Sequence, residues 1–432
     1  MTVGELRDAS VSRGRRIRRF LGSRAALWLA FAIVHGALVW LNLGARGYPL
    51  GDVTGVYRVW AENAAAGYVR MGIDAPWVYP ILAFAPMAAS LAFGSEWYGQ
   101  TWLAIVVLLN AAAFAILLGD RRLSRTRRIA AWWWVGFLAL LGPIALGRID
   151  AVTVPLALTG LLWAAGRPRV AATLLTIGAW VKVWPAALLA SVVIASRKRW
   201  DVSIVAVALS AGILGVSLVA GSWLNALGFV AEQADRGLQV EAPIAAVWLW
   251  QMVAGSRAVD IVYDRQILTF QISGPGADAA AALTTPVMAV GVGVVLLLGI
   301  RAVRRGAAFG RLLPPLALSF VVVLMLANKV GSPQFATWLA APIILGLALW
   351  PRRYLVPALL AAAIALLTHV LYPYLYGWLL VAHPAFVLLV TVKAALLAAL
   401  LAWGIRAVWR AGTVRGVAGL DRASAPERSA RE

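Results

Sequence analysis

Apolar runs recur along the chain from Ala25 to Ala402, with short polar segments between them. A helix of about 20 mainly apolar residues crosses the hydrocarbon core of a bilayer. The pattern therefore predicts a polytopic helical membrane protein. The clear spans are expected at residues 25–44, 97–119, 129–147, 150–165, 202–220, 282–303, 312–328, 334–350, 354–373 and 380–404.

A short apolar segment at residues 78–94 fits this scheme less simply, since it contains Pro80 and Pro86. If it crossed the membrane, the basic cluster at residues 121–128 would lie outside the cell. Basic loops stay on the cytoplasmic side of membrane proteins. We therefore expect an interfacial or re-entrant helix on the outer side.

The apolar segment at residues 170–196 is basic at both ends and contains Lys182, followed by Trp184-Pro185. Proline interrupts the hydrogen bonds of a helix interior, and a lysine inside a membrane is costly without a partner. A hairpin of two short helices, with Lys182 near its outer tip, resolves both problems. Counting the hairpin as two, we expect about 12 membrane helices.

Charge placement fixes the expected topology. The chain carries 39 Lys and Arg against 18 Asp and Glu, a formal net charge of +21, and the basic residues cluster at the ends of apolar runs. This is the positive-inside pattern, so nucleic acid is not an expected partner, whereas anionic membrane lipids are. We expect a basic cytoplasmic N-terminus at residues 1–24, one transmembrane domain at 25–404 and a disordered cytoplasmic tail at 405–432, in the plasma membrane.

Two long loops are expected on the outer side, at about residues 46–96 and 221–281, the second with an amphipathic stretch at 229–239. Long loops in compact proteins are usually functional. We therefore expect the chemistry at the outer face.

Composition agrees with this class and removes several kinds of site. The chain is 62% hydrophobic and 13% charged, whereas soluble domains are roughly 45–50% apolar and about 25% charged. It has no cysteine, which excludes disulfides and cysteine-ligated metals, and its three histidines are scattered. No metal site or cofactor is expected. Many of the 21 tryptophans flank spans, as in an aromatic belt.

Asp52 lies just past the first span, in the first outer loop. A carboxylate at the lipid–water boundary is in a low-dielectric setting, which suits it to act as a base for a hydroxyl proton. The alternative is an N-cap of a helix at residues 53–66, because Asp is a preferred cap. Nearby, Arg58 and Glu62 are one helical turn apart and are expected to form an ordinary ion pair.

Three cations on the outer side could meet a phosphate. Arg148 lies in a tight connection, where a lipid phosphate or Asp150 could pair with it. Lys182 is the strongest candidate, because depth makes its charge costly; a phosphate or Asp150 would satisfy it. Lys329, in the polar turn at residues 328–334, could bind a phosphate or snorkel to the interface.

Taken in order, several segments resemble the GT-C membrane glycosyltransferases, and glycosyltransferase family 87 in particular. They are Asp52–Tyr57 with the Tyr-Pro segment at 78–86, the Gly-Arg-Ile-Asp segment at 145–150, the Lys-Val-Trp-Pro segment at 178–185, and the segment around Ser-Pro at 328–338. The resemblance spans about residues 20–405 and implies a GT-C fold.

The resemblance also implies an inverting transfer of a sugar, with mannose expected, from a polyprenyl-phosphate donor to a glycolipid or polysaccharide acceptor. Asp52 would be the catalytic base, and the donor phosphate would meet Lys182, Arg148 and Lys329. Glu62, Asp74 and Asp150 are possible helpers. The residues expected to line the sugar and acceptor site are Tyr57, Arg58, Glu62, Tyr79, Asp150, Trp184, Asn328 and Gln334.

The chain departs from the family pattern at two places. Gln334-Phe335 stands where a mannosyltransferase subgroup has histidines, and Arg148-Ile149-Asp150 replaces the usual Gln-Ile-Asn. Arabinofuranosyl transfer is therefore the nearest variant. Two hypotheses of other classes are a transporter or flippase of a lipid-linked sugar, which would carry charges within several spans, and a non-catalytic scaffold.

Overall fold

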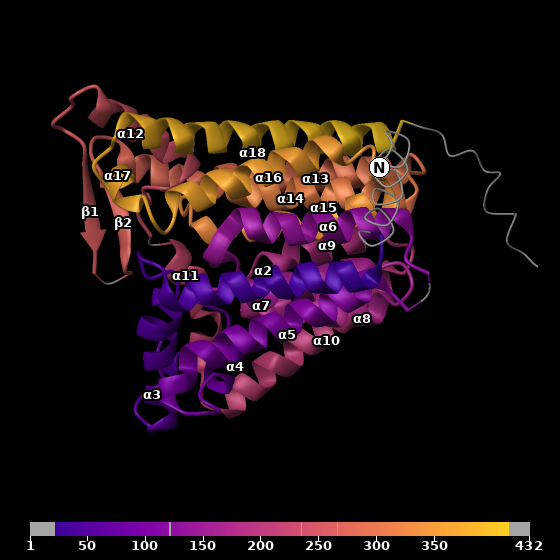
Figure 1. The fold of residues 1–432 in the computed structure, drawn as a ribbon, viewed down its shortest axis with the longest axis horizontal. Helices are drawn as coiled ribbons and strands as arrows, with labels where there is room; N and C mark the ends of the chain where they lie inside the picture. Colours follow the sequence, from indigo (N-terminus) through magenta and orange to yellow (C-terminus); the bar gives the residue numbers. More distant parts are fainter. Residues whose placement is uncertain (1–21, 121, 235, 266, 414–432) are drawn as a thin grey trace, which may run out of the picture.

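The computed structural model describes residues 22–120, 122–234, 236–265 and 267–413. Most of this chain is helical, and the long helices run side by side in one bundle (Figure 1). Among the described residues, seven helices are long and apolar enough to cross a membrane. They are α2 (Arg24–Gly44), α5 (Tyr98–Leu118), α6 (Arg125–Leu141), α10 (Arg199–Val219), α13 (Ala277–Arg304), α14 (Phe309–Leu326) and α18 (Pro384–Ala411).

Shorter apolar helices complete the bundle: α7 (Asp150–Trp163), α8 (Pro168–Val181), α9 (Pro185–Ala195), α15 (Ala340–Leu349) and α16 (Leu355–Leu371). Each of the ten predicted spans coincides with one of these helices or with a helix and its adjoining 3-10 turn. The expected fold class, an all-α polytopic membrane protein, is therefore confirmed. The figure of about 12 membrane helices stays a prediction.

The break in the segment at residues 170–196 lies where the sequence predicted it. Helix α8 ends at Val181, and the backbone of Lys182 is extended, with φ −152° and ψ 134°. Helix α9 begins at Pro185, a position where proline is tolerated because its missing N–H would have no partner within the helix. The two short helices therefore put Lys182 at a connection instead of inside a helix.

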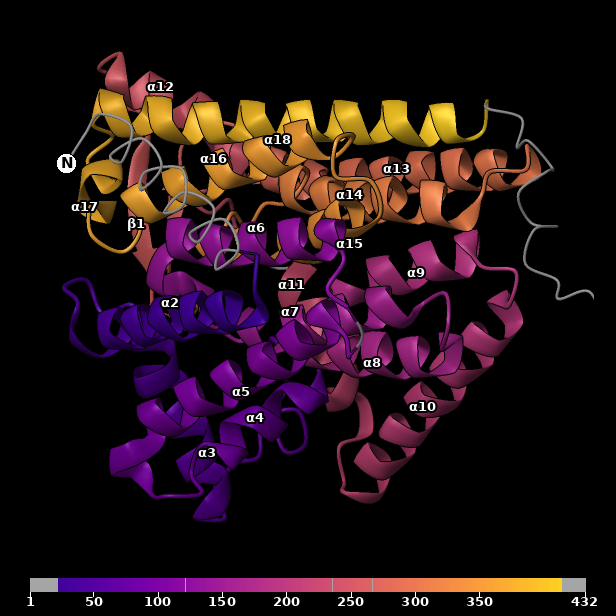
Figure 2. The ribbon, with the colours of Figure 1, turned by 45° about the vertical axis from the view of Figure 1, so that its right-hand side comes forward.

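Helices α10 and α18 lie on opposite outer edges of the bundle in both views (Figures 1 and 2). In the most apolar 18-residue window, only 11% of α10 is buried, against 72% of α14. The exposed side chains of α10 include Ile204, Val207 and Val216. An apolar face of this extent would be a liability in water but suits contact with lipid.

The smaller elements gather mainly at one end of the bundle, on the left in Figure 1. Those of the first loop are the π-helical η1 (Asp52–Tyr57), α3 (Arg58–Ala65), η2 (Ile81–Ala83), α4 (Phe84–Ala89) and η3 (Ser95–Trp97). Residues 81–89 thus form short helical turns, and their interfacial position on the outer side stays a prediction. Later elements are η4 (Gly142–Ala145), η5 (Trp223–Leu227), α11 (Gly228–Ala234), η6 (Pro243–Ala245), α12 (Ala246–Val253), η7 (Pro333–Leu339) and α17 (Tyr376–Leu380).

The second long loop contains an antiparallel hairpin that the sequence analysis did not predict. Strand β1 (Asp260–Asp264) pairs with β2 (Thr269–Ser273), with Asp260 opposite Ser273. The backbone N–H of Val240 donates to Phe270, and Leu238 accepts from Ile272. The amphipathic stretch at 229–239 is therefore helical only to Ala234, because its last residues pair with β2.

Backbone packing is very close where the second loop meets the turn at residues 328–334. The N–H of Gln239 donates to the carbonyl of Lys329 (3.0 Å), and the N–H of Gly331 donates to Oε1 of Gln239 (3.1 Å). A Cβ on Gly331 would lie 1.9 Å from the carbonyl oxygen of Glu241. Only glycine fits this contact without backbone movement.

We predict that Gly331→Ala lowers the melting temperature in detergent strongly, because its methyl group forces the two segments apart; overpacking typically costs about 1–3 kcal/mol and occasionally more. The matched control is Gly293→Ala on α13, where a Cβ meets nothing within 4 Å. That variant should keep or slightly raise the melting temperature, since alanine is the better helix former. Equal melting temperatures for the two variants would contradict the packing described.

Candidate functional site

Asp52 is held by a buried arginine from a distant part of the sequence. Its Oδ2 lies 3.0 Å from Nε of Arg148, and the Asp52 side chain is 44% exposed whereas that of Arg148 is 6% exposed. Asp52 is the first residue of η1, and Gly51 occupies the cap position with no side-chain cap bond. The N-cap alternative is therefore wrong: the carboxylate pairs with Arg148 and remains half open to solvent.

The other N–H groups of Arg148 bind oxygens of neighbouring segments. Nη1 donates to the carbonyls of Pro49 (2.6 Å) and Gly147 (2.7 Å), and Nη2 donates to the hydroxyl of Tyr372. Burial disfavours the charged guanidinium, but Asp52 and the nearby tyrosines outweigh this, so the pKa of Arg148 lies above its ordinary value. Neither of the expected partners, Asp150 or a lipid phosphate, is needed to satisfy this arginine.

Two tyrosines connect this ion pair with Lys182. The hydroxyl of Tyr57 lies 3.3 Å from that of Tyr79 and accepts from the N–H of Ile149 (3.4 Å). The Nζ of Lys182 lies 4.6 Å from the centroid of the Tyr79 ring, a cation–π contact. The structure therefore brings together five predicted site residues: Asp52, Tyr57, Tyr79, Arg148 and Lys182.

Asp150 belongs to a separate buried group. It is fully buried, and its Oδ1 accepts from Nε1 of Trp338 (2.6 Å). Trp184 stacks on Trp338 with ring centroids 5.5 Å apart and donates to the hydroxyl of Thr153 (2.9 Å). Neither Asp150 nor Trp184 faces an open surface here, so the expectation that they line a sugar site finds no support in this packing.

The turn at residues 328–334 is also more enclosed than expected. The side chain of Lys329 is buried, which argues against snorkelling to the interface. Asn328 uses its Oδ1 to accept the N–H of Val330 (2.9 Å), and Gln334 is buried. These three residues shape the turn itself.

The remaining predicted polar residues lie on the first long loop. Arg58 and Glu62 form the expected ion pair at 3.7 Å, with both side chains partly exposed. Asp74 pairs with Arg70 at 2.8 Å in an exposed turn, so it is occupied away from Asp52.

Sequence reasoning missed two buried ionisable residues near this cluster, Glu241 and Lys393. Glu241 is buried in the second loop, hydrogen-bonds Tyr376 and lies near the buried Lys393 of α18. Burial raises the pKa of Glu241 to about 7, and the nearby Lys393 and Arg148 oppose that rise. The available signal was Lys393 itself, a lone charge within an apolar run. Among the described residues, no group of three His, Cys, Asp or Glu side chains could hold a metal ion.

The raised pKa of Glu241 predicts a pH dependence of stability. Between about pH 4.5 and 7 the folded protein keeps a proton that the unfolded chain releases, so this residue makes the protein less stable as pH rises. Glu241→Gln should therefore gain melting temperature relative to the wild type between pH 5 and 8. Glu232→Gln, at an exposed position on α11, is the matched control. A Glu241→Gln variant less stable than wild type at pH 8 would show that an ionised pair with Lys393 stabilises the fold.

Comparison with protein families provides independent evidence. Residues 77–264 match the model of glycosyltransferase family 87, a region that includes Tyr79, Arg148 and Lys182. No curated protein and no solved structure matches the chain. The match agrees with the resemblance of the sequence motifs and with the helical membrane fold. The family 87 match over residues 77–264 therefore supports a GT-C membrane glycosyltransferase.

Proposed function

We propose that the protein transfers a sugar, with mannose expected, from a polyprenyl-phosphate donor to a glycolipid or polysaccharide acceptor at the outer face of the plasma membrane. The observation that carries the proposal is the half-exposed Asp52 carboxylate, oriented by the buried Arg148 within a cluster that also holds Lys182. Asp52 lies outside the segment of the family match, so its role is argued from this geometry and from the resemblance of its own segment.

The reaction is a single inverting displacement. An acceptor hydroxyl attacks the anomeric carbon while Asp52 takes its proton. The bond between the anomeric carbon and the phosphate oxygen breaks, and polyprenyl phosphate leaves with the electron pair. Because the leaving group is a stable anion, the protein needs no general acid, whereas a nearby cation in a low-dielectric site stabilises the developing charge.

Lys182 is the cation best placed for the donor phosphate. It is half-buried at the break between α8 and α9, and its cation–π contact with Tyr79 leaves its ammonium N–H groups able to donate. Arg148 is reassigned from phosphate binding to positioning, because its guanidinium already serves Asp52 and three other oxygens.

Three further features support a donor that arrives within the membrane plane. Apolar side chains cover the outer edges of the bundle. Under the positive-inside rule, the basic loops favour a cytoplasmic location for both termini. The loops that carry Asp52 and Glu241 then lie outside, where a lipid-linked donor presents its sugar.

The transporter alternative predicted charges within several spans. Lys393 within α18 is such a charge, but it lies near Glu241 of the outer loop. It therefore belongs to the packing at this end of the bundle, and the family match favours transfer over transport.

Asp52→Asn should lower kcat by about 10²–10⁴-fold, the usual contribution of a general base, with little change in donor KM. The assay measures transfer of a radiolabelled sugar to membrane glycolipids. The donors are polyprenyl phosphates that carry mannose, arabinose or glucose. Asp74→Asn, which breaks an exposed ion pair on the same loop, is the matched control and should keep wild-type activity. Full transfer by Asp52→Asn would refute the base assignment, and no transfer by the wild type from any donor would refute the proposed function.

Lys182→Ala should raise donor KM by about tenfold, the effect of losing one charge-assisted hydrogen bond of about 1.5 kcal/mol. Lys182→Arg should restore part of this affinity because the charge is kept. The matched control is Lys198→Ala. Lys198 lies between the end of α9 and the start of α10, at the end of α9 opposite to Lys182. Unchanged donor KM in Lys182→Ala would leave this lysine with a structural role only.

A further inference from the structure

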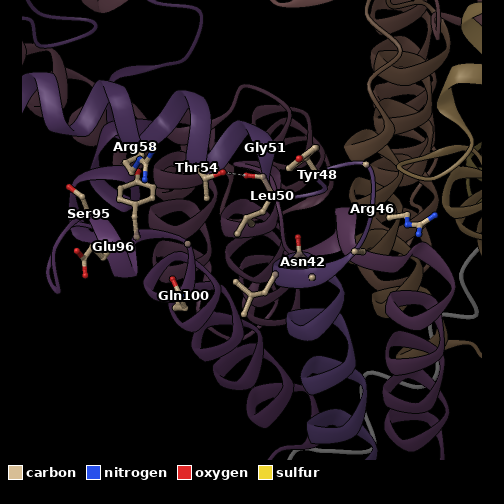
Figure 3. Close-up of a pocket in the computed structure, with 16 residues that line it drawn as sticks. Asn42, Arg46, Tyr48, Leu50, Gly51, Thr54, Arg58, Ser95, Glu96 and Gln100 are labelled. Carbon is tan, nitrogen blue, oxygen red and sulfur yellow. Dashed lines mark hydrogen bonds between the residues drawn. The ribbon is translucent and has the colours of Figure 1, made fainter.

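A pocket of about 580 Å³ lies where the end of α2 meets the start of α5, against the face of η1 and α3 (Figure 3). Its volume is in the range of small-molecule sites, about 300–1,000 Å³. None of its lining residues is Arg148, Lys182 or Tyr79, so it is distinct from the cluster proposed to bind the donor.

The lining mixes apolar and polar groups, and its charged residues are Arg46, Arg58 and Glu96. Arg58, Ser95 and Glu96 lie on one side of the pocket in Figure 3, with Gln100 below them. The side chain of Arg46 points away from the others, so it adds little positive charge to the interior. One guanidinium, one carboxylate, an amide and a hydroxyl suit the paired donors and acceptors of sugar hydroxyls, and the balance of charge favours a neutral ligand over a phosphate.

Two buried residues of the lining carry polar atoms that need partners. Asn42 donates to the carbonyls of Leu38 and Pro143, both at 2.9 Å, but its Oδ1 has no hydrogen-bond partner among the described residues. The hydroxyl of the buried Tyr98 likewise lacks one within that part of the chain. Both atoms are enclosed by protein instead of open to the pocket, with Oδ1 of Asn42 facing Gly147, so the choice of ligand depends on the exposed side chains Ser95, Glu96 and Gln100.

The wall nearest the catalytic segment is formed by residues on both sides of Asp52 in the sequence. Gly51 and Thr54 line the pocket, and Thr54 donates its hydroxyl to the carbonyl of Leu50 (3.2 Å). Gly99 of α5 lets η1 approach, because a Cβ there would lie 3.3 Å from Thr54 and 3.0 Å from Leu50. Asp52 thus stands between this pocket and the Arg148 cluster.

We propose that this pocket binds a neutral, polyhydroxylated glycan, the sugar portion of the acceptor. That this glycan is the acceptor rests on the proposed function, whereas binding of a glycan in the pocket does not depend on transfer. A single displacement requires the acceptor hydroxyl and the leaving phosphate on opposite sides of the anomeric carbon, and a glycan in this pocket would extend its reacting hydroxyl to Asp52 past the face of η1 that Gly51 and Thr54 form.

The absence of cysteine in the whole chain permits a site-specific test. Gln100→Cys places one thiol in the pocket, at an exposed position where the substitution is tolerated, and Gln251→Cys on α12 is the matched control. Each purified variant is reacted with a maleimide, with and without methyl mannoside, methyl arabinofuranoside, methyl glucoside or membrane glycolipid extract. Phospholipid vesicles without glycolipid form the remaining arm.

We expect at least one glycan ligand to slow labelling at position 100 by fivefold or more and to leave labelling at position 251 unchanged. A bulky maleimide at position 100 should then raise acceptor KM at least fivefold without changing donor KM. Slowing by the phospholipid vesicles alone would overturn the proposal in favour of a lipid headgroup. Equal labelling under every condition would overturn it as well.

The two proposals fail separately. Protection at position 100 in a protein that transfers no sugar would refute the proposed function and keep the glycan site. Transfer that is insensitive to a blocked position 100 would keep the enzyme and refute the site. Monodisperse elution of both cysteine variants checks that each has folded.

Discussion

A guanidinium buried at the end of an apolar helix bundle is stable only when its N–H groups find oxygens. Arg148 finds four, from Asp52, Pro49, Gly147 and Tyr372. Loss of one partner would leave the buried guanidinium poorly compensated, although solvent screening at the half-exposed Asp52 makes the cost smaller than for a fully buried pair. Arg148 therefore holds together three segments: the first long loop, the connection before α7 and the segment after α16. Its contact with Asp52 fixes the position of that carboxylate.

The same cost of burying charge explains the rest of this end of the molecule. Lys182 escapes the helix interior because Pro185 ends α8 and starts α9, which leaves its ammonium beside the ring of Tyr79. Helix α18 has no such break at Lys393, and this lysine instead lies near Glu241 of the second long loop. Apolar faces such as that of α10 then remain for the lipid, so charge and hydrocarbon are separated along the bundle axis.

This separation is what a reaction at a membrane surface needs. Under the proposed function, a lipid-linked donor diffuses with its chain in the bilayer, and its phosphate reaches the boundary, where burying a cation costs less than in the hydrocarbon core. In the proposed arrangement Asp52 lies between two binding regions. Lys182 belongs to the first, and the pocket lined by Gln100 is the second. The half-exposed carboxylate is the group that both sides share.

The sequence alone determined the helices, because each span must be apolar over the thickness of a bilayer and must end where polar residues begin. It also determined the break at Lys182, since proline and a membrane-embedded charge each disfavour a continuous helix. The tertiary structure decided the pairing: Arg148 meets Asp52 instead of its sequence neighbour Asp150, which Trp338 binds. The approach of Glu241 to Lys393 and the pocket beside η1 likewise depend on segments far apart in the chain. Local sequence patterns indicate which residues are buried and how each segment folds. The partner of a buried charge depends instead on which distant segments the packing of the bundle brings together.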